Sequence, residues 1–234
     1  NVSTNANIKN TLFVNTINVS GNATVADRLT TNVLEVLDNV YIYSEMVVND
    51  INVSNNTNIV NNLTTGYLNV TKDSIFNGDL LVNNINVSGD TNVYGTITTF
   101  NLDINNNADI TDTLTVNNIN VSENTNIINT LTTSYLNVTN DSVLRGGLLV
   151  NNLNVSGIAN ITDTLISNYL NISGDTIIKG ELAVNNIIVS TNSNIIGTLT
   201  ANNLNISSDS IINGNLLVNN ILVSGNTNIS FLFS

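Results

Sequence analysis

The most constraining feature of this sequence is an apolar, β-branched residue that recurs every 17 positions along the whole chain. We call this position slot 0 and number every other position of a repeat by its distance from it. Slot 0 holds Val2, Val19, Val36, Val53, Val70, Val87, Ile104, Val121, Val138, Val155, Ile172, Val189, Ile206 and Val223. No insertion or deletion interrupts the series. A fixed period of about 20 residues is typical of solenoids and fibres, in which one supersecondary unit stacks on the next.

Three pairs of slots define the fold of one repeat. Apolar or small residues occupy slots −2 and 0, +4 and +6, and +10 and +12. A spacing of two residues is the strand period, in which alternate side chains face one side. Gly, Asn and Asp separate the pairs, and these residues tolerate the positive φ of sharp corners. We therefore predict an all-β, parallel β-solenoid of about fourteen 17-residue coils, each with three short strands and an aliphatic interior.

A longer period of two coils, a 34-residue superrepeat, overlies the coil period. Slot +12 alternates between Val and Thr, as in Val82, Thr99, Val116 and Thr133. The alternation is compatible with a duplication history, with one larger turn built from two repeats, or with intertwined chains. We predict a single solenoid domain over residues 1–234. Its coils within residues 1–50 are the least regular, and residues 228–234 are expected to form a terminal cap or a junction.

Composition bears on the function classes open to the chain. The 234 residues include no His, which is the usual general base and imidazole metal ligand, and no Cys, which is the usual thiolate ligand. We therefore expect no enzyme, no cofactor and no metal site. The net charge of −12 reflects only five Lys and Arg residues, which argues against binding to nucleic acid phosphates. No apolar run approaches the length of a membrane span, about 18 residues. The chain begins in mid-coil without Met, as expected of a processed product or a piece of a longer protein.

Asparagine also recurs at fixed positions of the repeat, including slot +13. Stacked amides hydrogen-bond to one another and to free backbone groups in cross-β arrays. We predict a structural ladder at 34-residue spacing, formed by Asn83, Asn117, Asn151, Asn185 and Asn219 together with the frame residues Val87, Val121, Val155, Val189 and Val223.

Sequons for N-glycosylation are dense at slot −1. They begin at Asn18, Asn52, Asn69, Asn86, Asn120, Asn137, Asn154, Asn171 and Asn205. Slot −1 should point outward, so that a glycan would be sterically possible. The alternative is that an Asn column beside a Ser or Thr column generates sequons automatically, and we favour this second interpretation.

Three further motifs have both a functional and a structural interpretation. Outward Thr-x-Thr pairs such as Thr96/Thr98 resemble ice-binding arrays, but coils such as that of Leu81 interrupt them. Asp residues that share slot +3 in alternate coils should lie roughly 9.5 Å apart. That distance is too great for shared Ca²⁺ coordination. Tyrosines at slot +14, namely Tyr67, Tyr135 and Tyr169, form either a sugar-stacking strip or packed corners, and we favour corners.

The phrases Leu-x-Val-Asn-Asn-x-Asn-Val-Ser-Gly, at 80–89, and Ile-x-Gly-x-Leu-x-Val, at 212–218, resemble shaft repeats of viral and phage tail-fibre proteins. They resemble β-solenoid adhesins and surface filaments more loosely. The resemblance implies a structural subunit outside a cell or on a virion. Its partner would be itself, as a head-to-tail filament or an intertwined trimer. Phe231 and Phe233 are candidates for the assembly end. The alternative function is an adhesin-type stalk whose outward Thr, Asn or Tyr ladders contact surface glycans.

Overall fold

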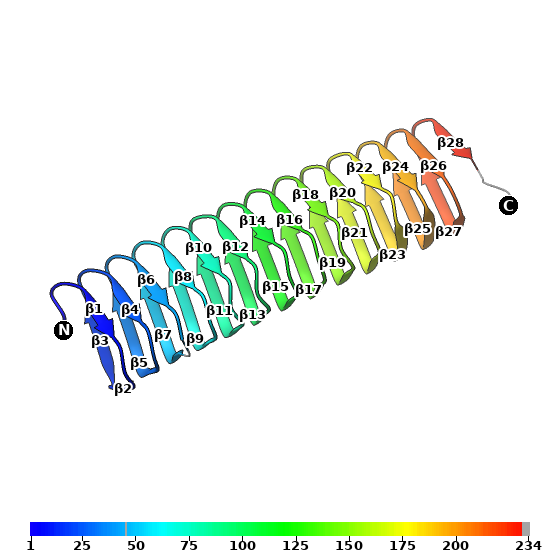
Figure 1. Cartoon of the computed structure of the whole chain (residues 1–234). Coiled ribbons are helices and arrows are strands. Elements are labelled where there is room, and N and C mark those ends of the chain that lie inside the picture. Colours follow the sequence, from blue (N-terminus) through cyan, green and yellow to red (C-terminus); the bar gives the residue numbers. More distant parts are fainter. Residues whose placement is uncertain (45, 231–234) are drawn as a thin grey trace. The chain divides into compact units, whose positions relative to one another are not determined.

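The computed structural model describes residues 1–44 and 46–230. It confirms an all-β parallel solenoid, in which equivalent positions of neighbouring coils are 17 residues apart. Each coil contributes a long strand, usually of eight residues, and a short strand, usually of three (Figure 1). Long strands pair with long strands and short strands with short ones, except that in the first coil two shorter strands together take the place of the long one. The chain divides into two compact units, residues 1–117 and 118–234, which are described separately below.

The first unit contains two parallel sheets. Its short strands are β1 (Ala6–Ile8), β4 (Ala23–Val25), β6 (Val40–Ile42), β8 (Thr57–Ile59), β10 (Ser74–Phe76), β12 (Thr91–Val93) and β14 (Ala108–Ile110). Its long strands are β5 (Leu29–Val36), β7 (Met46–Val53), β9 (Leu63–Val70), β11 (Leu80–Val87) and β13 (Ile97–Ile104), preceded in the first coil by β2 (Leu12–Phe13) and β3 (Thr16–Val19).

The second unit repeats this arrangement. Its short strands are β16 (Thr125–Ile127), β18 (Ser142–Leu144), β20 (Ala159–Ile161), β22 (Thr176–Ile178), β24 (Ser193–Ile196), β26 (Ser210–Asn213) and β28 (Thr227–Ser230). Its long strands are β17 (Leu131–Val138), β19 (Leu148–Val155), β21 (Leu165–Ile172), β23 (Glu181–Val189), β25 (Thr198–Ile206) and β27 (Leu216–Val223), while β15 (Leu114–Val121) contains the boundary between the units.

The register follows the sequence period within each unit. Val87 lies beside Val70, and Val155 lies beside Val138, so each residue neighbours its equivalent 17 positions away. The frame residues Val87, Val121, Val155 and Val189 are at most 2% exposed. Val223, in the last described coil, is half-buried. Because every inward slot stacks on the same slot of the next coil, the aliphatic columns form the core.

The division of the coil into three strands holds only for the first coil. In later coils one strand spans both slots +10 to +12 and slots −2 to 0. The corner lies inside this strand, where two successive residues, such as Asn83 and Asn84 of β11, both face away from the core. Pairing between neighbouring long strands omits slot +13 at this bend. The strand therefore bends without ending, and the Asn-Asn segment predicted as a turn belongs to it.

One 17-residue repeat completes one turn of the solenoid, so the 34-residue period does not mark a larger turn. The alternation at slot +12 instead distinguishes two kinds of coil. Thr99 is buried, and its Oγ1 donates to the carbonyl oxygens of Asn83 and Asn101, each at 3.1 Å. Thr31 and Thr65 make equivalent pairs of bonds at the same slot. In alternate coils a valine fills the position and packs without such bonds. The hydroxyls of Thr31, Thr65, Thr99 and Ser167 thus bind carbonyls at the bend, whereas Ala201 at the same slot has no hydroxyl.

A second column of interior hydroxyls has no such partners. It occupies slot +4, at the first residue of the short strands. Among the described residues, no hydrogen-bonding partner reaches the buried hydroxyl oxygens of Thr57, Ser74, Thr91, Thr125, Ser142, Thr176, Ser193 and Ser210. Alanine takes this slot in other coils, for example Ala108 and Ala159, and is equally buried. The slot therefore selects for small size and not for hydrogen bonding.

Candidate functional site

The sharp corner after slot 0 is held by side chains and not by positive φ. Over residues 1–44 and 46–230 only Gly197 and Gly214 have positive φ, and no Asn or Asp does. The expectation that Asn and Asp serve these corners through positive φ is therefore wrong. Their role is hydrogen bonding: Asp73 Oδ1 accepts the backbone N–H of Asp90 at 3.0 Å, and Asn39 Oδ1 accepts that of Asn56 at 3.1 Å.

These bonds form a column that we call the corner ladder, defined as the residues at slot +3. In each rung the side-chain oxygen of the earlier coil accepts the backbone N–H of the same slot in the next coil. The acceptors include Asn5, Asn22, Asn39, Asn56, Asp73, Asp90, Asn124, Asp141, Asp175, Asn192 and Asp209. A corner N–H has no strand partner, so the side chain supplies one. Asp73, Asp141, Asp175 and Asp209 thus serve as structural acceptors.

The corner ladder has one chemical gap, at Ile158. Its backbone N–H binds Asp141 Oδ1 at 2.8 Å, but its own aliphatic side chain has no oxygen to offer to the next coil. Every other repeat carries Asn or Asp at this slot, so the column could have been identified from sequence by its residue type. The Asp residues alone occupy only some of these positions, so a search for Ca²⁺ ligands among them does not reveal the continuous column.

We expect Ile158→Asn to raise the free energy of unfolding by about 0.5–1 kcal/mol, because the new Oδ1 can accept the corner N–H of Asp175. Ile158 is 45% exposed, so little buried apolar area is lost. Urea denaturation of wild type, Ile158→Asn and Ile158→Leu would measure the effect. Equal stability of the Asn and Leu variants would contradict the role given to the rung.

The predicted amide ladder takes a definite form in the second unit. Asn168, Asn185, Asn202 and Asn219 at slot +13 each donate from Nδ2 to the Oδ1 of the preceding coil, beginning with Asn151, at 3.0–3.3 Å. Successive bonds therefore join adjacent coils and not alternate ones. The predicted members Asn151, Asn185 and Asn219 lie in this run, and Asn168 and Asn202 connect them. In the first unit Phe100 occupies the slot between Asn83 and Asn117, so no amide connects those two.

The sequon asparagines lie in long strands with their side chains facing outward. Asn120, Asn137, Asn154 and Asn171 are exposed. Asn18, Asn52, Asn69, Asn86 and Asn205 are half-buried. Successive sequons such as Asn137 and Asn154 pair directly across neighbouring strands. Their side chains are therefore only about 5 Å apart, which leaves little room for a glycan on each.

The slot +14 tyrosines differ in their surroundings. Tyr67 lies over the next coil, where its hydroxyl accepts a 2.7 Å hydrogen bond from Asn86 Nδ2. Tyr135 and Tyr169 are 52% and 54% exposed, with Asn152 between them in the intervening coil. Tyr67 therefore packs against the neighbouring coil, whereas Tyr135 and Tyr169 expose their rings to solvent.

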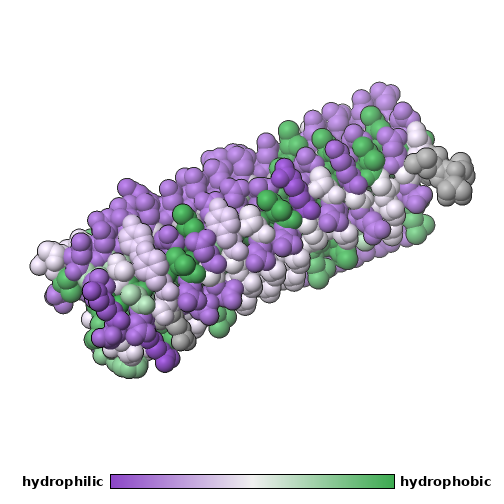
Figure 2. Space-filling view, viewed as in Figure 1, coloured by the Kyte–Doolittle hydropathy of each residue, from purple (hydrophilic) through white to green (hydrophobic). Residues whose placement is uncertain are grey.

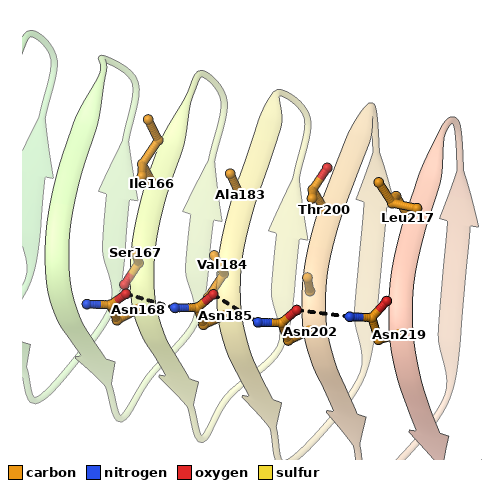
Figure 3. A pocket seen from close by; sticks show the side chains of 11 residues that line it. Ile166, Ser167, Asn168, Ala183, Val184, Asn185, Thr200, Asn202, Leu217 and Asn219 are labelled. Carbon is orange, nitrogen blue, oxygen red and sulfur yellow. Dashed lines mark hydrogen bonds between the residues drawn. The ribbon is translucent and has the colours of Figure 1, made fainter.

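A shallow groove lies on the outer side of β21, β23, β25 and β27 in the second unit. Two rows of side chains line it: Ile166, Ala183, Thr200 and Leu217 at slot +11, and Asn168, Asn185, Asn202 and Asn219 at slot +13 (Figure 3). Its volume is about 390 Å³. We call it the amide groove. Small side chains at Ala183 and Thr200 form its floor, between the larger Ile166 and Leu217.

On the face shown in Figure 2 most of the surface is hydrophilic, with separate hydrophobic patches. Phe231 and Phe233, the candidate assembly residues, lie outside the described residues. Within the described part of the chain, no three Asp or Glu side chains gather in an arrangement suited to a metal ion. The same residues include no helix of the length and apolarity needed to cross a bilayer.

Comparison with protein-family models, with curated proteins and with solved structures finds no match to this chain.

Proposed function

We propose that this chain is a structural subunit of a filament or fibre outside a cell or on a virion, assembled by head-to-tail stacking of its terminal coils. The observation that carries the proposal is the in-register stack itself, in which each coil buries its inward aliphatic side chains against the next coil, so that a coil without a neighbour presents an apolar surface. Ile221 is 46% exposed, although Leu204, at the same slot one coil earlier, is 1% exposed. Ile229 is 36% exposed, and its equivalent Ile212 is 0% exposed.

A second coil surface stacked on this one would bury those side chains as the interior coils bury theirs. Full burial of an isoleucine contributes about 1.5–3 kcal/mol. The first coil offers a matching surface, since Ile8, at the slot of Ile229, is half-buried. β28 and β1 are the outermost strands of the short-strand sheet at the two ends. Within residues 1–44 and 46–230 each of them pairs with a strand on one side only, and such edges pair with other strands.

The hydrogen-bond ladders favour one orientation of stacking. In the corner ladder the later coil always donates and the earlier coil always accepts, from Asn22 on Asn5 to Asn226 on Asp209. The amide ladder at slot +13 has the same direction. The C-terminal face therefore presents acceptor oxygens and the N-terminal face presents donors. Head-to-tail contact joins donors to acceptors, whereas head-to-head contact opposes donors to donors.

The proposed location outside a cell or on a virion is supported by the resemblance of the 80–89 phrase to fibre-shaft repeats and by the dense sequons. A repeated coil without side branches suits a spacer, because its length is set by the number of repeats.

Sedimentation velocity of the 234-residue chain over a wide concentration range would test the assembly. We expect the mass to rise progressively with concentration, because a heterologous contact does not close. The variant Ile221→Asp/Ile229→Asp should weaken association at least about tenfold, since about 1.4 kcal/mol corresponds to that factor. Negative-stain images of the same samples would show whether the larger species are filaments.

The matched control is Leu81→Asp/Leu149→Asp, which makes the same change at exposed side chains of interior coils. It should assemble like the wild type. A wild-type chain that stays monomeric at high concentration would refute the proposal. A mass that stops at three chains would support an intertwined trimer instead, and equal loss in both double variants would show that net charge is responsible.

A further inference from the structure

We infer that the amide groove is a binding site for a neutral, extended oligosaccharide of the β-1,4-linked type, which lies across β21, β23, β25 and β27. Of its four strands only β27 also belongs to the terminal coil surface of the proposed function, and the central residues Ala183, Asn185, Thr200 and Asn202 lie in coils before it. The inference starts from the arrangement in Figure 3, where one row of amides runs parallel to one row of mostly apolar side chains.

The amides have fixed orientations. Asn185 donates to Asn168 at 3.0 Å, Asn202 to Asn185 at 3.1 Å and Asn219 to Asn202 at 3.0 Å. A primary amide has two N–H donors and two acceptor lone pairs, and each ladder bond uses one of either kind. Asn185 and Asn202, which each make two ladder bonds, thus retain one donor and one acceptor. Since their orientation is already fixed, a ligand that binds them orders few side chains on binding.

The spacing of these groups selects an extended ligand with a matching repeat. Neighbouring coils are about 4.8 Å apart, so the four amides span roughly 14 Å. A pyranose linked through opposite ring carbons advances by a similar distance per residue, and each of its hydroxyls can both donate and accept a hydrogen bond. A peptide strand laid along the same line would advance only about 3.3 Å per residue and would lose register with the amides.

The second row supplies the apolar contact. Ile166 is 49% exposed, while Ala183 and Thr200 leave a hollow between it and Leu217. The C–H face of a sugar ring is apolar, and it can cover these side chains while the ring hydroxyls at its edge reach the amides. Burial of the C–H face adds affinity without requiring further polar partners.

Charge narrows the ligand class. The described residues that line the groove carry no charge, and the chain as a whole has a net charge of −12. Phosphate or carboxylate groups would find no cation there, and the overall field would repel them. A neutral glycan carries no such penalty, so the groove suits hydroxyl-rich ligands and not acidic ones.

Titration of the isotopically labelled chain with cellohexaose, monitored by NMR of the Asn side-chain amides, would test the site. We expect the Asn185 and Asn202 signals to shift. Maltohexaose, whose α-linkages curve the chain, should bind at least tenfold more weakly. The variant Ala183→Leu/Thr200→Leu should reduce cellohexaose affinity at least tenfold. It fills the hollow with the side chain that Leu81, Leu149 and Leu217 already place at this slot, so the fold should tolerate it.

Thr98→Leu makes the same kind of change at slot +11 of the first unit, outside the groove, and should bind cellohexaose like the wild type. The inference is overturned if cellohexaose fails to bind at millimolar concentration, if the filled variant binds unchanged, or if maltohexaose binds equally well. Sedimentation of the filled variant separates the two proposals, because it should assemble like the wild type.

Discussion

Replacement of Phe76 by Ala is expected to lower the free energy of unfolding of the first unit by about 3–5 kcal/mol. Phe76 is 0% exposed and stands in β10 between Ile59 and Val93 of the neighbouring coils. Every other described residue at slot +6 is a smaller aliphatic. Loss of the ring would leave a cavity that the stacked coils cannot close, because their spacing is set by backbone hydrogen bonds.

Urea denaturation combined with amide hydrogen exchange would measure this effect. Exchange should accelerate most in the strands next to β10, since each coil contacts only its neighbours, and should stay unchanged around Ile178 in the second unit. Phe76→Ile restores the common residue type of the slot and should cost no more than about 1.5 kcal/mol. A cost below about 1 kcal/mol for Phe76→Ala would show that the core relaxes into the space.

The second large effect has the opposite sign. We expect the triple variant Ser74→Ala/Ser142→Ala/Ser210→Ala to be more stable than the wild type by roughly 3 kcal/mol, or about 1 kcal/mol per site. Each hydroxyl is buried at slot +4 without a hydrogen-bonding partner among the described residues. Removal of an unsatisfied polar atom eliminates its desolvation cost. The three serines share no neighbouring residue across the strands, so their effects should add.

Thr99→Val is the matched control, because Thr99 is a buried hydroxyl with two carbonyl acceptors. It should lose about 1 kcal/mol, although valine is the residue of slot +12 in alternate coils. Thermal denaturation monitored by circular dichroism would compare the variants. If the serine variants were destabilised, their hydroxyls must bind a partner in solution, and the contrast between slots +4 and +12 would fail.

Much of the fold could be predicted from periodicity. A strict 17-residue series of aliphatics, arranged in pairs two apart, leaves few solutions other than parallel coils in register, since a one-residue slip would place Val87 or Val155 on the wrong face. The pairing of each with its equivalent one coil away is confirmed. The outward direction of slot −1 also follows from alternation, and the exposed Asn137 and Asn154 bear it out.

The role of the polar residues could be predicted only in part. Asn and Asp were expected at corners through backbone tolerance, but their side-chain oxygens serve the next coil, as Asp73 does for Asp90. Sequence spacing does not distinguish these two explanations, because both place the same residues at the same slots. Likewise, the predicted ladder spaced its members two coils apart, as in Asn151 and Asn185. The hydrogen bonds instead join adjacent coils, through Asn168.

The sequence by itself determined the coil length, the register and the inward columns, because stacking in register at a period of 17 places every alternating aliphatic on the inner face. Only the tertiary structure decided where the coil bends, which hydroxyls find acceptors, and that the rows of Ala183 and Asn185 enclose a groove. Those features depend on the distance and direction between atoms of neighbouring coils. Residue order along one coil does not specify these quantities.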